Sequence, residues 1–131
     1  YESWAEGRGL AGAAAAFDAD PDADGSVNGI EFVTGGEPNP ANPGAALRDG
    51  LPAAASSGGY LVITYTLADD AASLDPHIEF ATDLAGPWTR AVHGVNADIQ
   101  TTDHGASDTV TVSIPMNGAP MKFARLKVVA P

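Results

Sequence analysis

The residues best suited to chemistry are acidic and amide side chains that recur at alternate positions between residues 20 and 31. Six residues of this stretch offer an oxygen ligand at regular spacing: Asp20, Asp22, Asp24, Ser26, Asn28 and Glu31. Ca²⁺ takes about six to eight hard oxygen ligands, and a twelve-residue loop supplies them from positions 1, 3, 5, 7, 9 and 12 around a glycine at position 6. A loop that begins at Asp20 matches every one of these positions and places Gly25 at position 6. The spacing therefore predicts a calcium site.

The expected ligand roles follow from the position of each residue in the loop. The three aspartates bind through carboxylates, position 7 through its backbone carbonyl, position 9 directly or through water, and the glutamate with both oxygens. The alternative is an acidic surface turn with Asn28-Gly29 at the corner of a hairpin. Four carboxylates within twelve residues repel one another without a cation, and the calcium loop accounts for more positions than the hairpin does.

The elements that must position this loop are short. Ser3-Trp4-Ala5-Glu6 matches a capping box and predicts a helix that begins there. Glycines weaken that helix, so we expect broken helical turns up to Phe17, with Trp4, Leu10 and Phe17 facing inward. A second helix is predicted over residues 29–34, because a glycine pair follows it.

The rest of the chain alternates apolar and polar residues with a period of two, which is typical of half-buried strands. The expected strands are residues 61–67, 78–80, 88–93, 97–101, 110–114 and 121–129. Residues 51–59 are interpreted as a loop in which Ala53 to Ala55 form a helical turn. In the last strand Arg125 and Lys127 share a face with Phe123, so this strand carries a bulge or exposes that set.

The predicted fold class is mainly β: a small antiparallel β-sandwich of the immunoglobulin or fibronectin kind, preceded by a short helix–calcium loop–helix segment. Acidic charge is concentrated at the front, where residues 1–44 carry 8 acids and 1 base, against 9 acids and 5 bases in residues 45–131. The three prolines of residues 35–44 predict a linker. We therefore expect a helical calcium segment with its linker over residues 1–44 and the sandwich over residues 45–131.

The overall composition narrows the function classes. The chain has 131 residues, a net charge of -11 and no cysteine, so a bound metal or attachment to a larger protein is the expected substitute for disulfides. The scarcity of basic residues argues against nucleic-acid binding and against a polybasic membrane contact. No apolar run approaches the roughly 20 residues that cross a bilayer. The first residues contain no initiator methionine or leader pattern, so we expect a piece of something longer.

Support for enzyme chemistry is thin, and we expect no catalytic activity. His77, His93 and His104 are isolated in the sequence, without zinc spacing, and the chain has no cysteine and no serine nucleophile motif. A glycosidase formed by two acids that meet in space stays open as an alternative.

A carbohydrate-binding face is the other non-enzymatic alternative. Its candidate residues are Trp88, Tyr60 and Tyr65, and Trp88 follows a Gly-Pro turn where it is either a core plug or a platform for a sugar ring. Exposure of Trp88 together with one of the tyrosines on a flat face would favour glycan binding. Burial of all three would favour a structural module.

The order of these parts resembles a C-terminal accessory module of large secreted bacterial proteins, and the acidic loop is similar to EF-hand and thrombospondin type 3 loops. The resemblance is carried by Tyr1, Trp4-Ala5, Gly9-Leu10, the loop with Asn28-Gly29-Ile30-Glu31-Phe32, Gly35-Gly36-Glu37-Pro38, and strands such as residues 59–65, 78–84 and 122–126. It implies a non-catalytic, secreted or cell-surface module joined to the rest of a larger polypeptide, with calcium stabilising the joining segment. Its implied partners are that polypeptide and a glycan or cell surface. The alternative is a carbohydrate-binding module appended to a polysaccharide-degrading enzyme.

Overall fold

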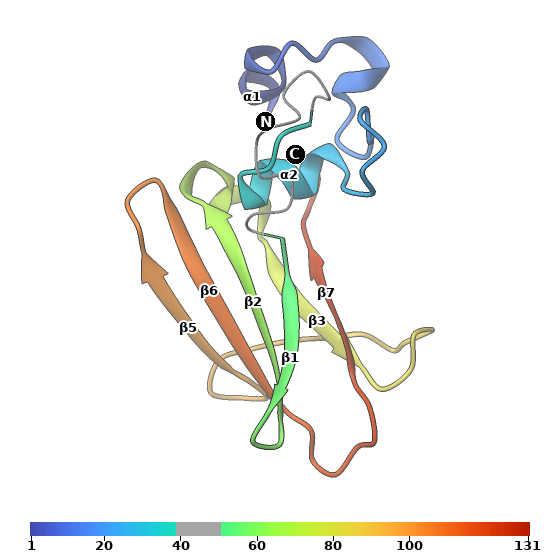
Figure 1. Ribbon diagram of the computed structural model, residues 1–131, viewed down its shortest axis with the longest axis vertical. Helices are drawn as coiled ribbons and strands as arrows, with labels where there is room; N and C mark the ends of the chain where they lie inside the picture. Colours follow the sequence, from blue (N-terminus) through green and yellow to red (C-terminus); the bar gives the residue numbers. More distant parts are fainter. Residues whose placement is uncertain (39–50) are drawn as a thin grey trace.

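The fold is mainly β, as the sequence predicts, with a short helical segment at one end of two antiparallel sheets (Figure 1). The computed structural model describes residues 1–38 and 51–131. The arrangement is consistent with a small β-sandwich. No helix of these residues is long and apolar enough to pass through a bilayer.

The larger sheet has four strands in the order β1-β2-β6-β5, and the smaller sheet has three in the order β4-β3-β7. The strands of the larger sheet are β1 (Ala53–Ser57), β2 (Tyr60–Ala68), β5 (Asp98–Asp103) and β6 (Ser107–Pro115). Those of the smaller sheet are β3 (His77–Ala81), β4 (Thr89–Arg90) and β7 (Phe123–Lys127). The predicted strand at residues 88–93 is therefore reduced to two residues.

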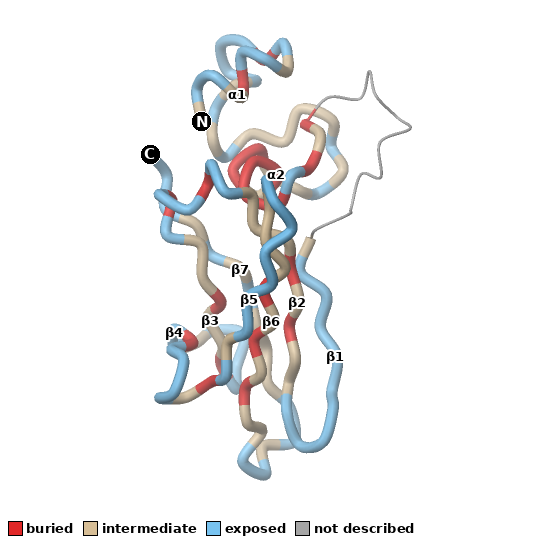
Figure 2. Tube along the Cα trace, turned by 90° about the vertical axis from the view of Figure 1, so that its left-hand side faces the viewer, coloured by how far each residue is buried: buried red, intermediate tan, exposed pale blue. Residues whose placement is uncertain are grey.

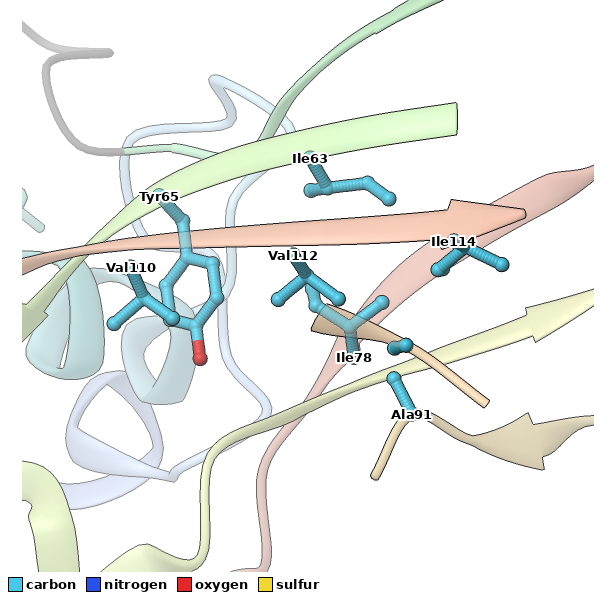
Figure 3. Packing of buried hydrophobic residues seen from close by; sticks show 8 residues of the cluster. Ile63, Tyr65, Ile78, Ala91, Val110, Val112 and Ile114 are labelled. Carbon is cyan, nitrogen blue, oxygen red and sulfur yellow. The ribbon is translucent and has the colours of Figure 1, made fainter. Parts of the chain in front are cut away.

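The main core lies between the two sheets, because alternate side chains of each strand point to the same side. Ile63 and Tyr65 of β2 pack with three residues of β6 and with Ile78 of β3 (Figure 3). Fully burying one isoleucine or valine side chain of this core stabilises the fold by about 1.5 to 3 kcal/mol. The residues between them point outward, and Thr64 and Thr111 face each other there with their hydroxyl oxygens 3.4 Å apart. The period-two prediction for these strands is confirmed.

The last strand resolves the two interpretations left open for its basic residues. Strand β7 pairs continuously with β3 from Phe123 to Lys127, so it has no bulge. Ala124 and Leu126 pack against the core. Arg125 and Lys127 therefore point away from it, and the strand exposes the basic set.

Residues 51–59 are not the predicted loop, and the helical turn expected at the alanines is wrong. Ala53 to Ser57 form the edge strand β1, and all five residues are exposed. Strand β1 appears exposed along its length in Figure 2. Gly58 and Gly59 both have positive φ, 56° and 85°, which is the backbone that a tight hairpin turn requires. Residues 53–57 therefore form a strand because they pair with the long apolar strand β2. Their own residue types give no strand pattern.

The N-terminal segment contains α1 (Glu2–Gly7), the 3-10 helix η1 (Gly12–Ala15) and α2 (Asn28–Thr34). The capping-box prediction is wrong, because the helix begins before Ser3 and Tyr1 occupies the N-cap without a side-chain hydrogen bond. The second helix is confirmed, and it ends at Gly35 in the left-handed conformation with φ 79°.

A second apolar cluster joins the helical segment to the sandwich. Phe32 and Val33 of α2 pack with Ala71 and Leu74 of the 3-10 helix η2 (Asp69–Leu74). Partly buried side chains from both parts surround them: Tyr1, Trp4, Phe17, Leu67, Ala68, Leu126 and Val128. Leu10 is buried, as expected. The predicted boundary at residue 44 and the linker from residue 39 onward lie outside the described residues.

Candidate metal centre

Three aspartate carboxylates converge in the loop before α2. Asp20, Asp22 and Asp24 each place one carboxylate oxygen within 4.8 Å of the other two, and this is the sole group of three or more potential metal-binding side chains at such distances in the described part of the chain. Backbone donors fold the loop around them: the Gly25 N–H donates to Asp20 Oδ2 at 3.0 Å and the Ser26 N–H to Asp24 Oδ1 at 2.7 Å. The φ of 97° at Gly25 suits the sharp turn that position 6 requires.

Glu31 carries a fourth carboxylate, which is buried and does not belong to the group of three within 4.8 Å. Its residue is 1% exposed, and neither Oε1 nor Oε2 has a hydrogen-bond partner among the described residues. Burial raises the pKa of Glu31, the charges of Asp22, Asp24 and Asp20 act in the same direction, and together they bring it from 4.5 to about 7. Burial also raises the pKa of Asp22, and the charges of Asp24 and Asp20 add to this effect. A buried carboxylate without donors and beside three other acids is unfavourable unless a cation compensates it.

Asn28 is held so that its amide oxygen is left over. The residue is 0% exposed, and its Nδ2 donates to the backbone carbonyls of Ala14 and Ala16, both at 2.8 Å. A carbonyl oxygen can only accept a hydrogen bond, so the NH₂ end of the Asn28 amide must face these two carbonyls. This fixes which way the amide points. Asn28 Oδ1 is buried without a hydrogen-bond partner in the described structure, and so is Asp20 Oδ1.

Buried oxygens without partners therefore gather on three predicted ligands: Asp20, Asn28 and Glu31. Such atoms are rare in folded proteins, and an ion that satisfies them is one of their recognised explanations. The carbonyl of Ser26 and the two-oxygen binding by Glu31 stay predictions.

The hairpin alternative for Asn28-Gly29 is wrong, because both residues are buried and belong to the first turn of α2. Their N–H groups donate to the carbonyls of Ala19 and Phe17, each at 2.8 Å. A Cβ at Gly29 would lie 2.4 Å from the Phe17 ring. Residues 17–19 thus pack directly on the start of α2 and close the loop.

Two features of the site have no clear signal in the sequence. Arg8 forms an ion pair with Glu37 and stacks on Trp4, 5.6 Å from its ring centre. Its positive charge offsets part of the rise in the pKa of Glu31. The carbonyls that orient Asn28 belong to a run of alanines, and a backbone carbonyl has no signature in the sequence. For Arg8 the sequence offers only its place as a base directly after the first helix.

The three aromatic residues proposed for a glycan face do not lie together. Tyr65 is 4% exposed in the main core. Trp88 is half-buried, with the outward-facing Arg125 guanidinium 4.2 Å from its ring centre, beside the smaller sheet. Tyr60 is 44% exposed at the start of β2 in the larger sheet. Tyr60 and Trp88 thus lie at different sheets and Tyr60 is exposed, so the structure matches neither the exposed flat face nor the burial of all three.

The three histidines are also apart. His77 lies on β3, where its Nδ1 is 2.6 Å from the Asp75 carbonyl oxygen. His93 follows β4 and accepts a hydrogen bond from the Ile99 N–H at 2.9 Å, and His104 is exposed in the turn after β5.

In comparisons with known proteins, no protein-family model matches the sequence, and no curated protein or solved structure matches the chain.

Proposed function

We propose that residues 20–31 bind one Ca²⁺ and that this ion holds the N-terminal helical segment together on the end of the sandwich. The observation that carries the proposal is Glu31, a buried carboxylate with two oxygens that lack hydrogen-bond partners among the described residues and with three aspartates raising its pKa. A divalent cation removes both problems at once, because it neutralises charge and takes up the free lone pairs.

The donor set favours calcium over magnesium. It consists of carboxylate, amide and carbonyl oxygens without nitrogen or sulfur, which hard cations prefer. Ca²⁺ accepts many oxygens in flexible geometry, whereas Mg²⁺ demands near-octahedral ligation and keeps several waters. The predicted ligands are Asp20, Asp22, Asp24, Asn28, Glu31 and the carbonyl of Ser26.

The biological role we propose is that of a non-catalytic accessory module of a larger secreted bacterial protein. Extracellular calcium modules bind the ion at about 10⁻⁴ to 10⁻³ M, where a loop of this kind is loaded outside the cell and empty in calcium-poor compartments. Calcium then acts on the segment that joins the sandwich to its parent polypeptide. The helix–calcium loop–helix character of that segment, and an immunoglobulin- or fibronectin-like sandwich, belong to the same proposal.

Calorimetric titration of chelator-treated protein tests the calcium site. We expect one Ca²⁺ per chain, much weaker Mg²⁺ binding, and at least a tenfold loss of calcium affinity in Glu31→Gln. Glu6→Gln is the matched control, since Glu6 is an exposed acid of α1 outside the loop, and it should bind as the unaltered protein does. The absence of binding at millimolar calcium would overturn the proposal.

A further inference from the structure

Two adjoining hollows lie at the end of the sandwich and share Tyr60 and Asp98. The larger has a volume of about 560 Å³ and extends to Phe80 and the β6–β7 connection. The smaller has a volume of about 380 Å³ and continues over Ser57, Val62 and Ser113 of the larger sheet. Both volumes fall in the range of about 300 to 1,000 Å³ that small-molecule sites occupy. Together they form one open groove that passes around the Tyr60–Asp98 pair.

The groove is at the end of the molecule opposite the proposed calcium site. The β1–β2 turn and the β6–β7 connection lie at the lower end of Figure 1, and the helical segment lies at the upper end. A ligand in the groove and an ion in the loop therefore do not compete for space. This inference stands independently of the calcium proposal.

The groove combines an aromatic wall with free hydrogen-bonding groups. The Tyr60 hydroxyl and the Asn117 amide, which line the larger hollow, have no hydrogen-bond partner among the described residues. His93 accepts the Ile99 N–H at Nδ1, so its neutral ring carries the proton on Nε2 and offers a donor. An aromatic ring beside donors and acceptors suits a ligand with an apolar face and hydroxyl groups at its rim.

The charge of the groove points to a neutral ligand. Besides His93, its lining contains one acid, Asp98, and one basic residue, Lys122. Both Asp98 oxygens accept from Gln100 Nε2 at 3.1 Å and keep further lone pairs for a ligand hydroxyl. The Lys122 ammonium group is already engaged, because it donates to the Pro115 carbonyl and lies 5.3 Å from the Phe80 ring centre. A polyanion would meet no free basic cluster here, and it would be repelled by a chain with a net charge of -11.

The walls of the groove are held in place without a ligand. Asn96 accepts from the Val92 N–H at 2.7 Å and donates to the Arg90 carbonyl at 2.9 Å, which ties the β4–β5 connection to itself. The Met116 N–H donates to the Gly59 carbonyl at 2.9 Å and joins the β6–β7 connection to the β1–β2 turn. Preformed walls reduce the ordering cost of binding.

From these observations we propose that the groove binds a neutral oligosaccharide, with a sugar ring stacked on Tyr60 and its hydroxyls hydrogen-bonded to Asp98, Asn117 and His93. Two adjoining hollows that share one aromatic residue fit successive sugar units of a chain, so affinity rises with chain length. Of the aromatic residues that the sequence suggested for glycan binding, only Tyr60 belongs to this site.

The test uses the calcium-loaded chain and amide NMR titrations with cellotetraose, xylotetraose, mannotetraose and laminaritetraose, glucose as the short probe, and tetragalacturonate as the anionic probe. We expect saturable shifts in residues 57–62, 93–98 and 113–122 with at least one neutral tetrasaccharide, and weaker binding of glucose. Tyr60→Ala and Asp98→Asn should each weaken binding about tenfold or more. Both side chains are exposed, so the melting temperature should stay within a few degrees.

Trp88→Ala is the matched control, because it removes an aromatic residue outside the groove and should leave the affinity unchanged. The proposal is overturned by no binding of any neutral probe at millimolar concentration, by preference for tetragalacturonate, or by binding that survives both groove variants. Loss of binding in Trp88→Ala alone would move the site to the smaller sheet and also overturn it. Calcium titration of the same variants separates the two proposals, since groove variants should retain normal calcium binding.

Discussion

Removing calcium should make the stability of the protein depend on pH in a direction set by Glu31. Burial and three neighbouring aspartates raise the pKa of its carboxyl from 4.5 to about 7 in the ion-free fold. Between these values the folded state retains a proton that the unfolded state releases. Stability is therefore lost as pH rises, and at about 1.4 kcal/mol per pKa unit the loss between pH 5 and pH 8 is about 2 to 3 kcal/mol.

The raised pKa of Asp22 adds to this loss in the same direction. Two other carboxyl groups act in a different pH range. Arg90 holds the pKa of Asp75 below its ordinary value, and Arg125 does the same for Glu79. Stabilisation from a lowered carboxyl pKa is present above the ordinary value of about 4 and is lost as pH falls below it. Their contribution to stability is therefore constant between pH 5 and pH 8.

Urea denaturation in chelator, followed by tryptophan fluorescence at several pH values, measures the effect. The unaltered protein should lose about 2 to 3 kcal/mol of unfolding free energy between pH 5 and pH 8, whereas Glu31→Gln should lack most of this loss. Saturating calcium should abolish it in the unaltered protein, because the ion holds the carboxylate ionised and paired. Parallel pH profiles of the protein and Glu31→Gln in chelator would refute the reasoning.

Three further predictions concern the same end of the molecule. Calcium at ten times its Kd should raise the unfolding free energy by about 1.4 kcal/mol, and calorimetric melting that is equal in calcium and in chelator would contradict a structural role. Gly29→Ala should destabilise the fold by about 1 to 3 kcal/mol, because the new Cβ would lie 2.4 Å from the Phe17 ring. Gly7→Ala is the control, since Gly7 has open space around it in α1, and it should not destabilise the fold. Equal shifts of the melting temperature in the two variants would argue against the packing of Phe17 on Gly29. Asn28→Ala should lower stability by about 1 to 2 kcal/mol even in chelator, since two carbonyls lose their donor, whereas Asp22→Asn should lower it only when calcium is present; urea curves with and without the ion distinguish them.

The sequence predicted those parts of the fold whose pattern is local. The alternation in residues 61–67 and 110–114 announces strands because a half-buried strand shows its two faces directly. Strand β1 has no such pattern, and its pairing depends on β2; the turn glycines Gly58 and Gly59 were its one local signal. The capping box at Ser3 failed because Tyr1 packs against the rings of Phe17 and Phe32, with centres 5.1 and 5.7 Å away, and so begins the helix earlier.

The candidate metal site also has a part that the sequence predicts and a part that depends on tertiary packing. Loop spacing identified the three aspartates that converge, because alternate residues of a tight loop face one point. The burial of Glu31 and the anchoring of Asn28 depend on tertiary packing, which residue types alone do not encode. The groove at the opposite end of the sandwich could not be predicted from the sequence. Its residues Tyr60, Asp98 and Asn117 come from separate segments, which only the strand order brings together.

The edge strand β1 has a consequence for how molecules of this protein behave toward one another. Its five exposed residues are alanines and serines without charge, and an outer strand of this kind offers backbone hydrogen-bonding groups to any extended chain. Charged residues, which commonly guard such edges, occur on the other outer strands, β4, β5 and β7. Mutual repulsion from a net charge of -11 therefore has to keep β1 edges apart, and that protection disappears near the isoelectric point of about 4.2. Mild acid or high salt should thus bring on reversible self-association through this edge before the fold itself is lost.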